Sequence, residues 1–200
     1  MLGAPRYSAT GCAGHDYRSA IVVRDESRDC LEEFRGAVLA VNGIDSQSGY
    51  NVVKATLRSA RLDTSASQPF FGCMKVTGTH RASIAMVQRA DADIAAIDPV
   101  SLALVRTHAP QEFTGLKVIQ YSPAAPSLPW VTSVHTSATI VSHLRRAIAD
   151  TLADPLLVKT LSTLHLSGFD AVDMREYERI DSMTSTSATM VLAPEDLAAS

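Results

Sequence analysis

Short apolar runs alternate with segments of helical spacing along the first two thirds of the chain. Five β-rich runs predict strands, at residues 17–23, 37–42, 70–77, 92–97 and 116–121. The segments between them predict helices or helical turns, at residues 25–35, 50–61, 82–89 and from 99 onward. This alternation predicts an α/β fold with a largely parallel sheet.

The last third of the chain has a different pattern. A proline-rich connection at 122–129 is a natural place for the chain to pass from one lobe to another. Beyond it we predict a strand at 128–133 and helices at 140–150 and 155–164. The Ser/Thr/Ala-rich segment 182–200 predicts a loosely ordered tail.

Composition narrows the class of protein. The chain has 200 residues, 46% of hydrophobic type, which is enough for one domain or for two small lobes. A formal net charge of -3 disfavours a basic nucleic-acid-binding face. The longest apolar runs, such as 20–23 and 94–97, are far shorter than the roughly 20 residues of a membrane-spanning helix. The first residues also lack the charged start and apolar run of a signal peptide.

The sequence predicts no metal or cofactor. Cys12, Cys30 and Cys73 have no metal-binding spacing, and we interpret them as small buried or half-buried thiols. The phosphate-binding pattern G-x-x-x-x-G-K-[ST] does not occur, which disfavours nucleotide hydrolysis.

Two strand-to-helix junctions carry the strongest chemical signal. They span residues 42–50 and 77–81, and each turns on glycine and small hydroxyl residues before a helix begins. In an open α/β sheet, such junctions line the crevice where ligands bind. Helix N-termini offer free N–H groups and a partial positive charge. Donors are added by Ser46, Ser48, Thr79 and His80, so the pattern indicates a site for a small anion.

Other interpretations of the same residues stay open. Serine and threonine at helix starts are ordinary N-caps, and Asp98 before Pro99 is also first an N-cap. An enzyme is disfavoured because neither a G-x-S-x-G elbow nor an H-E-x-x-H metal motif is present. Asp45, Ser46 and His80 could be imagined as a catalytic trio, but a chain of this length offers such a trio by chance.

Several runs taken together resemble a known family. They are Tyr17-Arg18-Ser19, Leu39-Ala40-Val41-Asn42, Asp45-Ser46-x-Ser48-Gly49-Tyr50, Val76 to Ser83, Ala92 to Asp98, Pro126 to Pro129 and Leu166-x-Gly168-Phe169. In order and spacing they are similar to the phosphate, phosphite and phosphonate substrate-binding proteins of ABC transporters. The resemblance covers roughly residues 3 to 180. Its serine/glycine run and its Gly-Thr-His run are fairly specific as a pair.

The resemblance implies a type 2 periplasmic-binding-protein fold, in which two α/β lobes joined by two crossing strands clamp a ligand. Residues 18–122 would form lobe two, 1–17 and 123–180 an incomplete lobe one, and 181–200 a tail. Lobe one is expected to be incomplete because family members carry an earlier strand and helix in it. Exposed apolar edges would follow.

The resemblance also implies a set of ligand-binding residues. Phosphoryl oxygens would be contacted by Ser46, Ser48, Thr79, His80 and the backbone of Gln47 and Gly49. Asp98 would accept a hydrogen bond from a ligand amine, hydroxyl or protonated phosphoryl oxygen, and Tyr17 is a further candidate.

The expected function is therefore capture of a phosphonate, phosphite or phosphate for ABC-type transport, without catalysis. The expected partner is a membrane permease, the expected state a monomer, and the expected location the periplasm. The alternatives are a ligand sensor in the cytoplasm, a degenerate fragment that binds nothing, and an enzyme acting on a phosphorylated small molecule. Thr79 stands where the family usually has serine, which keeps the hydroxyl.

Overall fold

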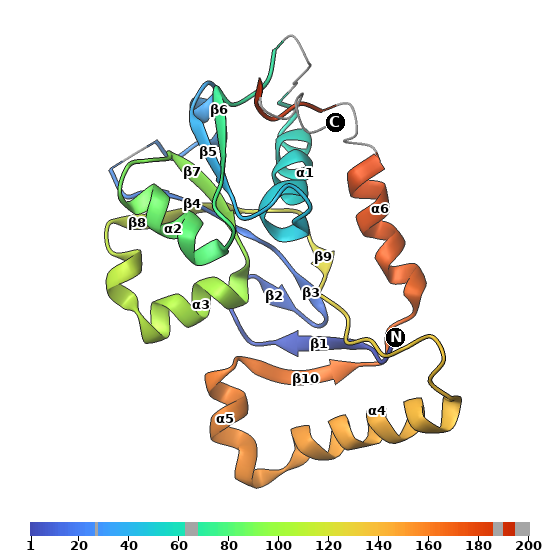
Figure 1. Ribbon diagram of the computed structural model, residues 1–200. Helices are drawn as coiled ribbons and strands as arrows, with labels where there is room; N and C mark the ends of the chain where they lie inside the picture. Colours follow the sequence, from blue (N-terminus) through green and yellow to red (C-terminus); the bar gives the residue numbers. More distant parts are fainter. Residues whose placement is uncertain (27, 63–67, 186–189, 195–200) are drawn as a thin grey trace.

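The larger part of the molecule is built around a five-stranded sheet. The computed structural model describes residues 1–26, 28–62, 68–185 and 190–194. The strand order is β6-β5-β7-β4-β8 (Figure 1). In sequence order these strands are β4 (Ala20–Arg24), β5 (Val38–Val41), β6 (Cys73–Val76), β7 (Ile94–Ile97) and β8 (Leu116–Tyr121). All five predicted strands of this region are present, each shorter than or as long as its apolar run.

The sheet is mixed, and this corrects the expectation of a largely parallel one. β5 is parallel to β6 and β7, whereas β4 is antiparallel to both β7 and β8. β4 is the strand by which the chain enters this sheet from the smaller unit, so it runs opposite to the four strands that follow it. Apolar patterning cannot reveal this reversal, because a strand buried on both faces has the same composition in either direction.

Helices cover both faces of the sheet. On one face lies α1 (Val52–Ser59), preceded by a π-helical turn, η2 (Gln47–Asn51). On the other lie α2 (His80–Gln88) and α3 (Pro99–His108). In β4, Ile21 and Val23 belong to the core beneath α1, and Ala20 and Val22 belong to the core beneath α2 and α3. Burial of consecutive residues explains why this strand is apolar without alternation. Short 3-10 turns complete the unit, at Leu31–Phe34 (η1) and Pro110–Phe113 (η3).

The smaller unit has only a two-stranded antiparallel sheet. β1 (Ala4–Tyr7) pairs with β10 (Leu166–Asp170), and neither was predicted as a strand. The predicted strand at 128–133 is wrong, since this segment contributes one isolated bridge between Gly3 and Trp130. Pro129 lies inside the predicted strand, and a proline has no backbone N–H to donate to a neighbouring strand.

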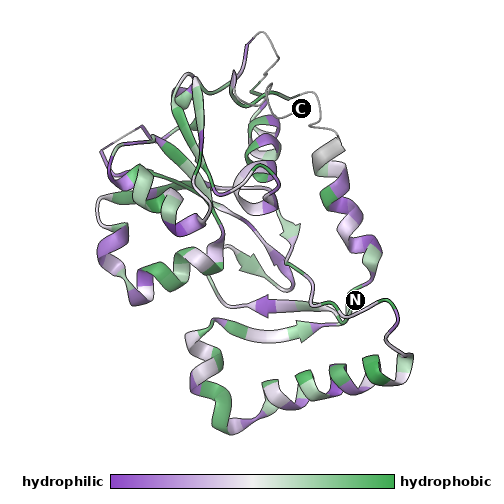
Figure 2. Ribbon diagram, in the orientation of Figure 1, coloured by the Kyte–Doolittle hydropathy of each residue, from purple (hydrophilic) through white to green (hydrophobic). Residues whose placement is uncertain are grey.

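Helices of the smaller unit are poorly covered. They are α4 (Ala138–Ala153) and, after the turn η4 (Pro155–Leu157), α5 (Val158–Thr163). None of the residues of α4 is buried, although the helix carries many apolar side chains (Figure 2). Leu156 is 88% exposed and Val158 is 63% exposed. A cavity of about 440 Å³ lies between α4 and β10.

Two crossing segments and a C-terminal helix join the units. The crossings contain β2 (Cys12–Ala13), β3 (Asp16–Tyr17) and β9 (Ala125–Pro126), which form a small sheet of their own. The chain then returns to the larger unit through η5 (Met174–Tyr177) and α6 (Glu178–Ser185). None of the described helices is long and apolar enough to cross a membrane.

The C-terminal segment differs from the expected loose tail. α6 is helical to Ser185, and Leu192 and Ala193 are fully buried in the core beneath α1. The Ser/Thr-rich composition of the segment concealed this, because the apolar stretch that is buried is short. The remainder of the predicted tail, at 186–189 and 195–200, lies outside the described residues.

Candidate functional site

Three helix starts meet at one edge of the five-stranded sheet. β5, β6 and β7 run in the same direction, and each is followed by a helix, beginning at η2, α2 and α3. A cavity of about 570 Å³ lies at this edge, between the two units. It is lined by Tyr7, Tyr17, Asn42, Asp45, Ser46, Gln47, Ser48, His80, Asp98, Val100, Ser101, Ser127 and Leu128.

The two predicted junctions meet directly. Ser48 Oγ lies 2.8 Å from His80 Nε2, which joins the start of η2 to the start of α2. The two residues are 32 positions apart in sequence. Their proximity follows from the parallel pairing of β5 with β6, which places the ends of both strands side by side.

Three of the predicted site residues are N-caps, as the alternative interpretation stated. Ser46 accepts a hydrogen bond from the Gly49 N–H at 3.0 Å, and Thr79 accepts one from the Ala82 N–H at 3.1 Å. Asp98 accepts one from the Ser101 N–H at 2.7 Å. Ser46 and Asp98 line the cavity as well, whereas Thr79 is exposed and does not. Capping therefore explains Thr79 in full.

Neutral donors dominate the wall formed by the larger unit. The first N–H groups of η2 belong to Gln47 and Ser48, at the end of a helix where the backbone has no intrahelical acceptors. The three helix N-termini add partial positive charge at the same edge. Neither lysine nor arginine occurs among the residues that line the cavity. Such a wall suits a small anion held by hydrogen bonds rather than by ion pairs.

Gly49 lies behind the cavity wall. A Cβ atom at this position would overlap the side-chain oxygen of Asn42 and would lie 3.3 Å from His80 Cε1. Glycine is therefore required for the close packing of η2 against the end of β5, not for a direct ligand contact. Of the predicted site residues, Gly49 and Thr79 do not line the cavity.

A buried tyrosine and a carboxylate, Tyr17 and Asp98, also line the cavity. Tyr17 is 5% exposed. Burial raises the pKa of its phenol strongly, the nearby negative charge of Asp98 raises it further, and hydrogen bonding with Ser48 works against both effects. Tyr17 therefore stays protonated and keeps a hydrogen to donate.

His80 is held in its neutral form. Burial lowers the pKa of the imidazole below its ordinary value, while the charge of Asp98 and a backbone hydrogen bond at Ala96 partly oppose this shift. A neutral imidazole has one donor nitrogen and one acceptor nitrogen. The hydrogen bond with Ser48 engages only one of them, Nε2.

Sequence reasoning missed several lining residues. Tyr7, Ser127 and Leu128 come from the smaller unit, and Val100 from α3. Tyr7 ends β1, which has no β-rich run to mark it. Asn42 could have been found, because it ends a predicted strand at the edge where the other candidates lie.

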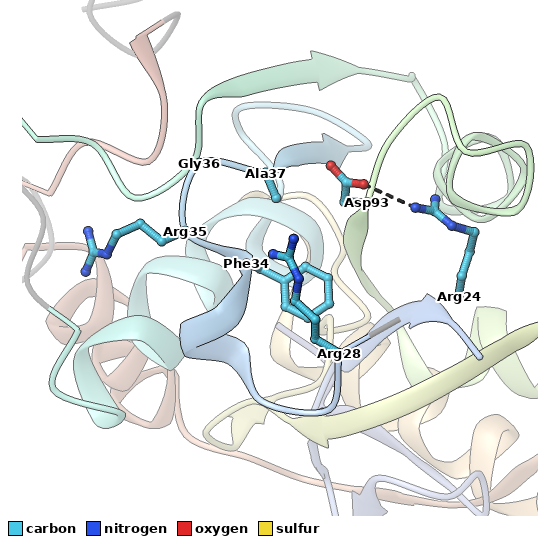
Figure 3. A pocket seen from close by; sticks show the side chains of 7 residues that line it. All are labelled: Arg24, Arg28, Phe34, Arg35, Gly36, Ala37 and Asp93. Carbon is cyan, nitrogen blue, oxygen red and sulfur yellow. Dashed lines mark hydrogen bonds and ion pairs between the residues drawn. The ribbon is translucent and has the colours of Figure 1, made fainter. Parts of the chain in front are cut away.

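A second hollow lies at the far end of the sheet and is structural. It is about 310 Å³ in volume and contains three arginines (Figure 3). Arg24 donates to the carbonyl oxygens of Val87 and Ala92 and pairs with Asp93 at 3.2 Å. Arg35 lies over the ring of Phe70 at 4.7 Å. These cations are used in holding the loops together, so we do not assign a ligand here.

Metal chemistry has no support in the described part of the chain. None of its groups of three or more His, Cys, Asp or Glu residues is arranged to hold a metal ion. The three cysteines are free, and Cys30 is exposed rather than buried.

The architecture defines the class of protein. Two α/β units with a ligand-sized cavity at the carboxyl ends of parallel strands match type 2 periplasmic binding proteins, which confirms the predicted fold. The chain belongs to the family of periplasmic substrate-binding proteins of phosphonate ABC transporters, whose model matches residues 4–177. Members of this family are transporter components and not enzymes.

Solved structures agree in fold at low sequence identity. A binding protein of an ABC phosphonate transporter, PA3383 from Pseudomonas aeruginosa, is 21% identical with a TM-score of 0.75, over 93% of this chain and 62% of that one. PhnD1 from Prochlorococcus marinus, solved with methylphosphonate, is 15% identical with a TM-score of 0.73, over 94% of this chain and 72% of that one. XAC2383 from Xanthomonas citri, solved with ATP, is 18% identical with a TM-score of 0.66, over 93% and 70%. No curated protein sequence matches this chain.

Proposed function

We propose that this protein captures a small phosphorus oxyanion, a phosphonate, phosphite or phosphate, for ABC-type transport. The observation that supports this most directly is the pairing of Ser48 with His80 at the meeting point of two helix starts. Unlike Ser46 and Thr79, Ser48 is not used as a cap. Its hydroxyl stands beside free N–H groups at the start of η2, where a phosphoryl oxygen would find several donors at once.

In this proposal the ligand lies against the three helix starts, with Asp98 beside it at the start of α3. Ser46, Ser48, His80 and the backbone of Gln47 would contact phosphoryl oxygens, and the Tyr17 phenol would add a donor from the crossing segment. Asp98 is an acceptor, so it favours a ligand that brings a hydrogen of its own, on an amine, a hydroxyl or a protonated phosphoryl oxygen. Sulfate and sulfonates are fully ionised at neutral pH and offer no such hydrogen.

The two units correspond in this proposal to the two lobes of the family. Residues 18–122 would form lobe two, and residues 1–17 with 123–180 would belong to lobe one. Binding would bring the lobes together by hinge closure about the crossing segments. A membrane permease would receive the ligand, the protein would act as a monomer, and the periplasm is the compartment proposed from the family.

Thermal unfolding with and without ligand tests the proposal. Millimolar methylphosphonate, 2-aminoethylphosphonate, phosphite and phosphate would be compared with sulfate and methanesulfonate. A ligand present at about 100 times its Kd stabilises the folded state by roughly 2.7 kcal/mol, which raises Tm visibly. We expect a shift with at least one phosphorus ligand, none with the sulfur controls, and loss of the shift in Ser48→Ala.

The same experiment tests the alternative of a degenerate fragment that binds nothing. A cooperative transition that none of these ligands moves would contradict the proposal and favour a fold that no longer binds. Thr79→Ala serves as the matched control, because Thr79 caps α2 without lining the cavity. It should lower Tm in the absence of ligand but keep the ligand-induced shift.

A further inference from the structure

The C-terminal segment touches both walls of the cavity. At its start, the Tyr177 hydroxyl donates to the Ser127 carbonyl oxygen at 2.8 Å, and Ser127 lines the cavity from the smaller unit. Near its end, Met183 accepts a hydrogen bond from the Gln47 side-chain amide through its sulfur at 3.7 Å. Gln47 lines the same cavity from the larger unit.

Further contacts fix the segment to the crossing strands and to α1. Arg179 pairs with Asp16 of β3 at 2.8 Å and with Glu176 at 3.3 Å. Arg58 of α1 donates to the Met183 carbonyl oxygen at 3.1 Å. α6 therefore lies alongside β9, η2 and α1, and it spans the space between the units (Figure 1).

The far end of the segment is anchored in the core of the larger unit. Leu192 and Ala193 are both fully buried, and the Phe71 N–H donates to the Leu192 carbonyl oxygen at 2.7 Å. Withdrawing these two side chains from the core would expose them to water and lose their apolar burial. This end is thus held independently of any contact that α6 makes.

We propose that η5, α6 and residues 190–193 form a strap, a third connection that restrains opening of the cavity between the two units. Most of the strap, α6 and residues 190–193, follows the residues matched by the family model, which end at Tyr177. Hinge opening would separate Ser127 from Gln47, and the strap contacts both residues, Ser127 through Tyr177 of η5 and Gln47 through Met183 of α6. Opening must therefore break the contacts at the start of the strap or withdraw the buried residues at its far end from the core.

The strap also bears on ligand affinity, and this part rests on the proposed function. Restraint of opening raises the fraction of molecules in which both walls face one ligand. The apparent Kd equals the intrinsic Kd divided by that fraction, so release of the strap weakens binding without changing any residue that contacts the ligand.

Release of the near end of the strap tests the proposal. Arg179→Ala combined with Tyr177→Phe removes the contacts to Asp16 and Ser127 and leaves the buried anchor intact. Arg175→Ala is the matched control, since Arg175 lies in the same segment and pairs with Asp173 at 3.0 Å, two residues away. Asp16→Asn weakens the same ion pair from the other side and leaves α6 unaltered.

Distances between the units provide the readout. Spin labels would be placed on cysteines at Lys159 in α5 and Thr107 in α3, both exposed, after replacement of the three native cysteines by serine. Pulsed electron paramagnetic resonance without ligand should give a longer and broader distance distribution in the release variant and in Asp16→Asn than in Arg175→Ala. An unchanged distribution in both, with normal circular dichroism, would overturn the strap.

Ligand titration then separates the two proposals. If methylphosphonate binds the parent chain, its Kd should rise about five- to tenfold in the release variant, a typical coupling between a conformational equilibrium and a site. If none of the phosphorus ligands binds the parent chain, the proposed function fails, while the distance measurement still decides on the strap.

Discussion

Ser48 Oγ and His80 Nε2 lie 2.8 Å apart and tie together the starts of two helices that follow neighbouring strands. Each side chain comes from a loop end that would otherwise be free to move at the edge of the sheet. The hydrogen bond orders both before any ligand arrives, which reduces the entropy lost on binding. The protonation state of His80 therefore affects the stability of the fold as well as the geometry of the site.

Stability should decrease when the pH falls below the ordinary pKa of histidine. The pKa of His80 is lowered in the folded state, mainly by burial. Below about pH 6.5 the unfolded chain takes up a proton that the folded chain resists, so unfolding becomes easier as the pH falls toward the lowered value. Above that range the contribution is fully present.

Thermal unfolding between pH 7.5 and 5.5 measures this effect. His80→Gln should show a smaller fall of Tm over this range than the parent chain. His108→Gln is the control, because His108 is exposed near the end of α3. Equal pH dependence in His80→Gln and the parent would show that another group causes it.

Capping and ligand binding should separate by mutation. Ser46→Ala and Thr79→Ala each remove a side-chain cap, and we expect each to lower the free energy of unfolding by about 1 kcal/mol. Ser48→Ala removes no cap and should cost less, while it abolishes the ligand-induced rise in Tm. Urea unfolding of the three variants, with equal m-values, would measure the difference. A larger loss in Ser48→Ala than in Ser46→Ala would refute this division of roles.

Gly49→Ala should destabilise the protein through one specific clash. The added methyl group would overlap the Asn42 side-chain oxygen, and overpacking of this kind typically costs 1 to 3 kcal/mol. Asn42→Ala removes the obstructing group, so the double variant should be more stable than the two single effects predict by addition. A double-mutant cycle in urea measures the coupling, and additivity within error would exclude the clash as the cause.

The sequence predicted the part of the fold whose signals are local. Apolar runs located β4 to β8, and the runs are clearest in β4, β5 and β7, which are buried on both faces. The junctions located Ser48 and His80 because glycine and hydroxyl residues follow these runs directly. Local signals also found Asp98 at the start of α3, where an N-cap residue followed by proline marks the beginning of a helix.

The parts of the fold that depend on long-range strand pairing were not predicted from the sequence. β1 and β10 pair across more than 150 positions and have little β-rich composition, so neither run indicated a strand. Tyr7 and Ser127 line the cavity only because that pairing and the crossings bring them there. The strap was likewise hidden, since Leu192 and Ala193 are buried against a core formed mainly by residues before position 100.

Asp98 should control the reactivity of a cysteine near the cavity. The pKa of the Cys12 thiol is raised to about 11, first by burial and second by the negative charge of Asp98. Asp98→Asn keeps a residue that caps helices well, so α3 should remain intact. It removes the charge, and the thiolate of Cys12 then forms more readily.

Thiol modification by a disulfide reagent at pH 8.5 to 9 measures the change. In a Cys30→Ser, Cys73→Ser background, Asp98→Asn should react about two- to fivefold faster than its parent, because burial still keeps the pKa above that of a free thiol. Asp45→Asn is a control that removes a carboxylate from the same cavity lining, and it should leave the rate unchanged, since Asp98 is the carboxylate that raises the pKa of Cys12. Equal rates in Asp98→Asn and its parent would mean that burial alone protects Cys12. Asp98 would then act on the cavity as a hydrogen-bond acceptor, with little effect through its charge.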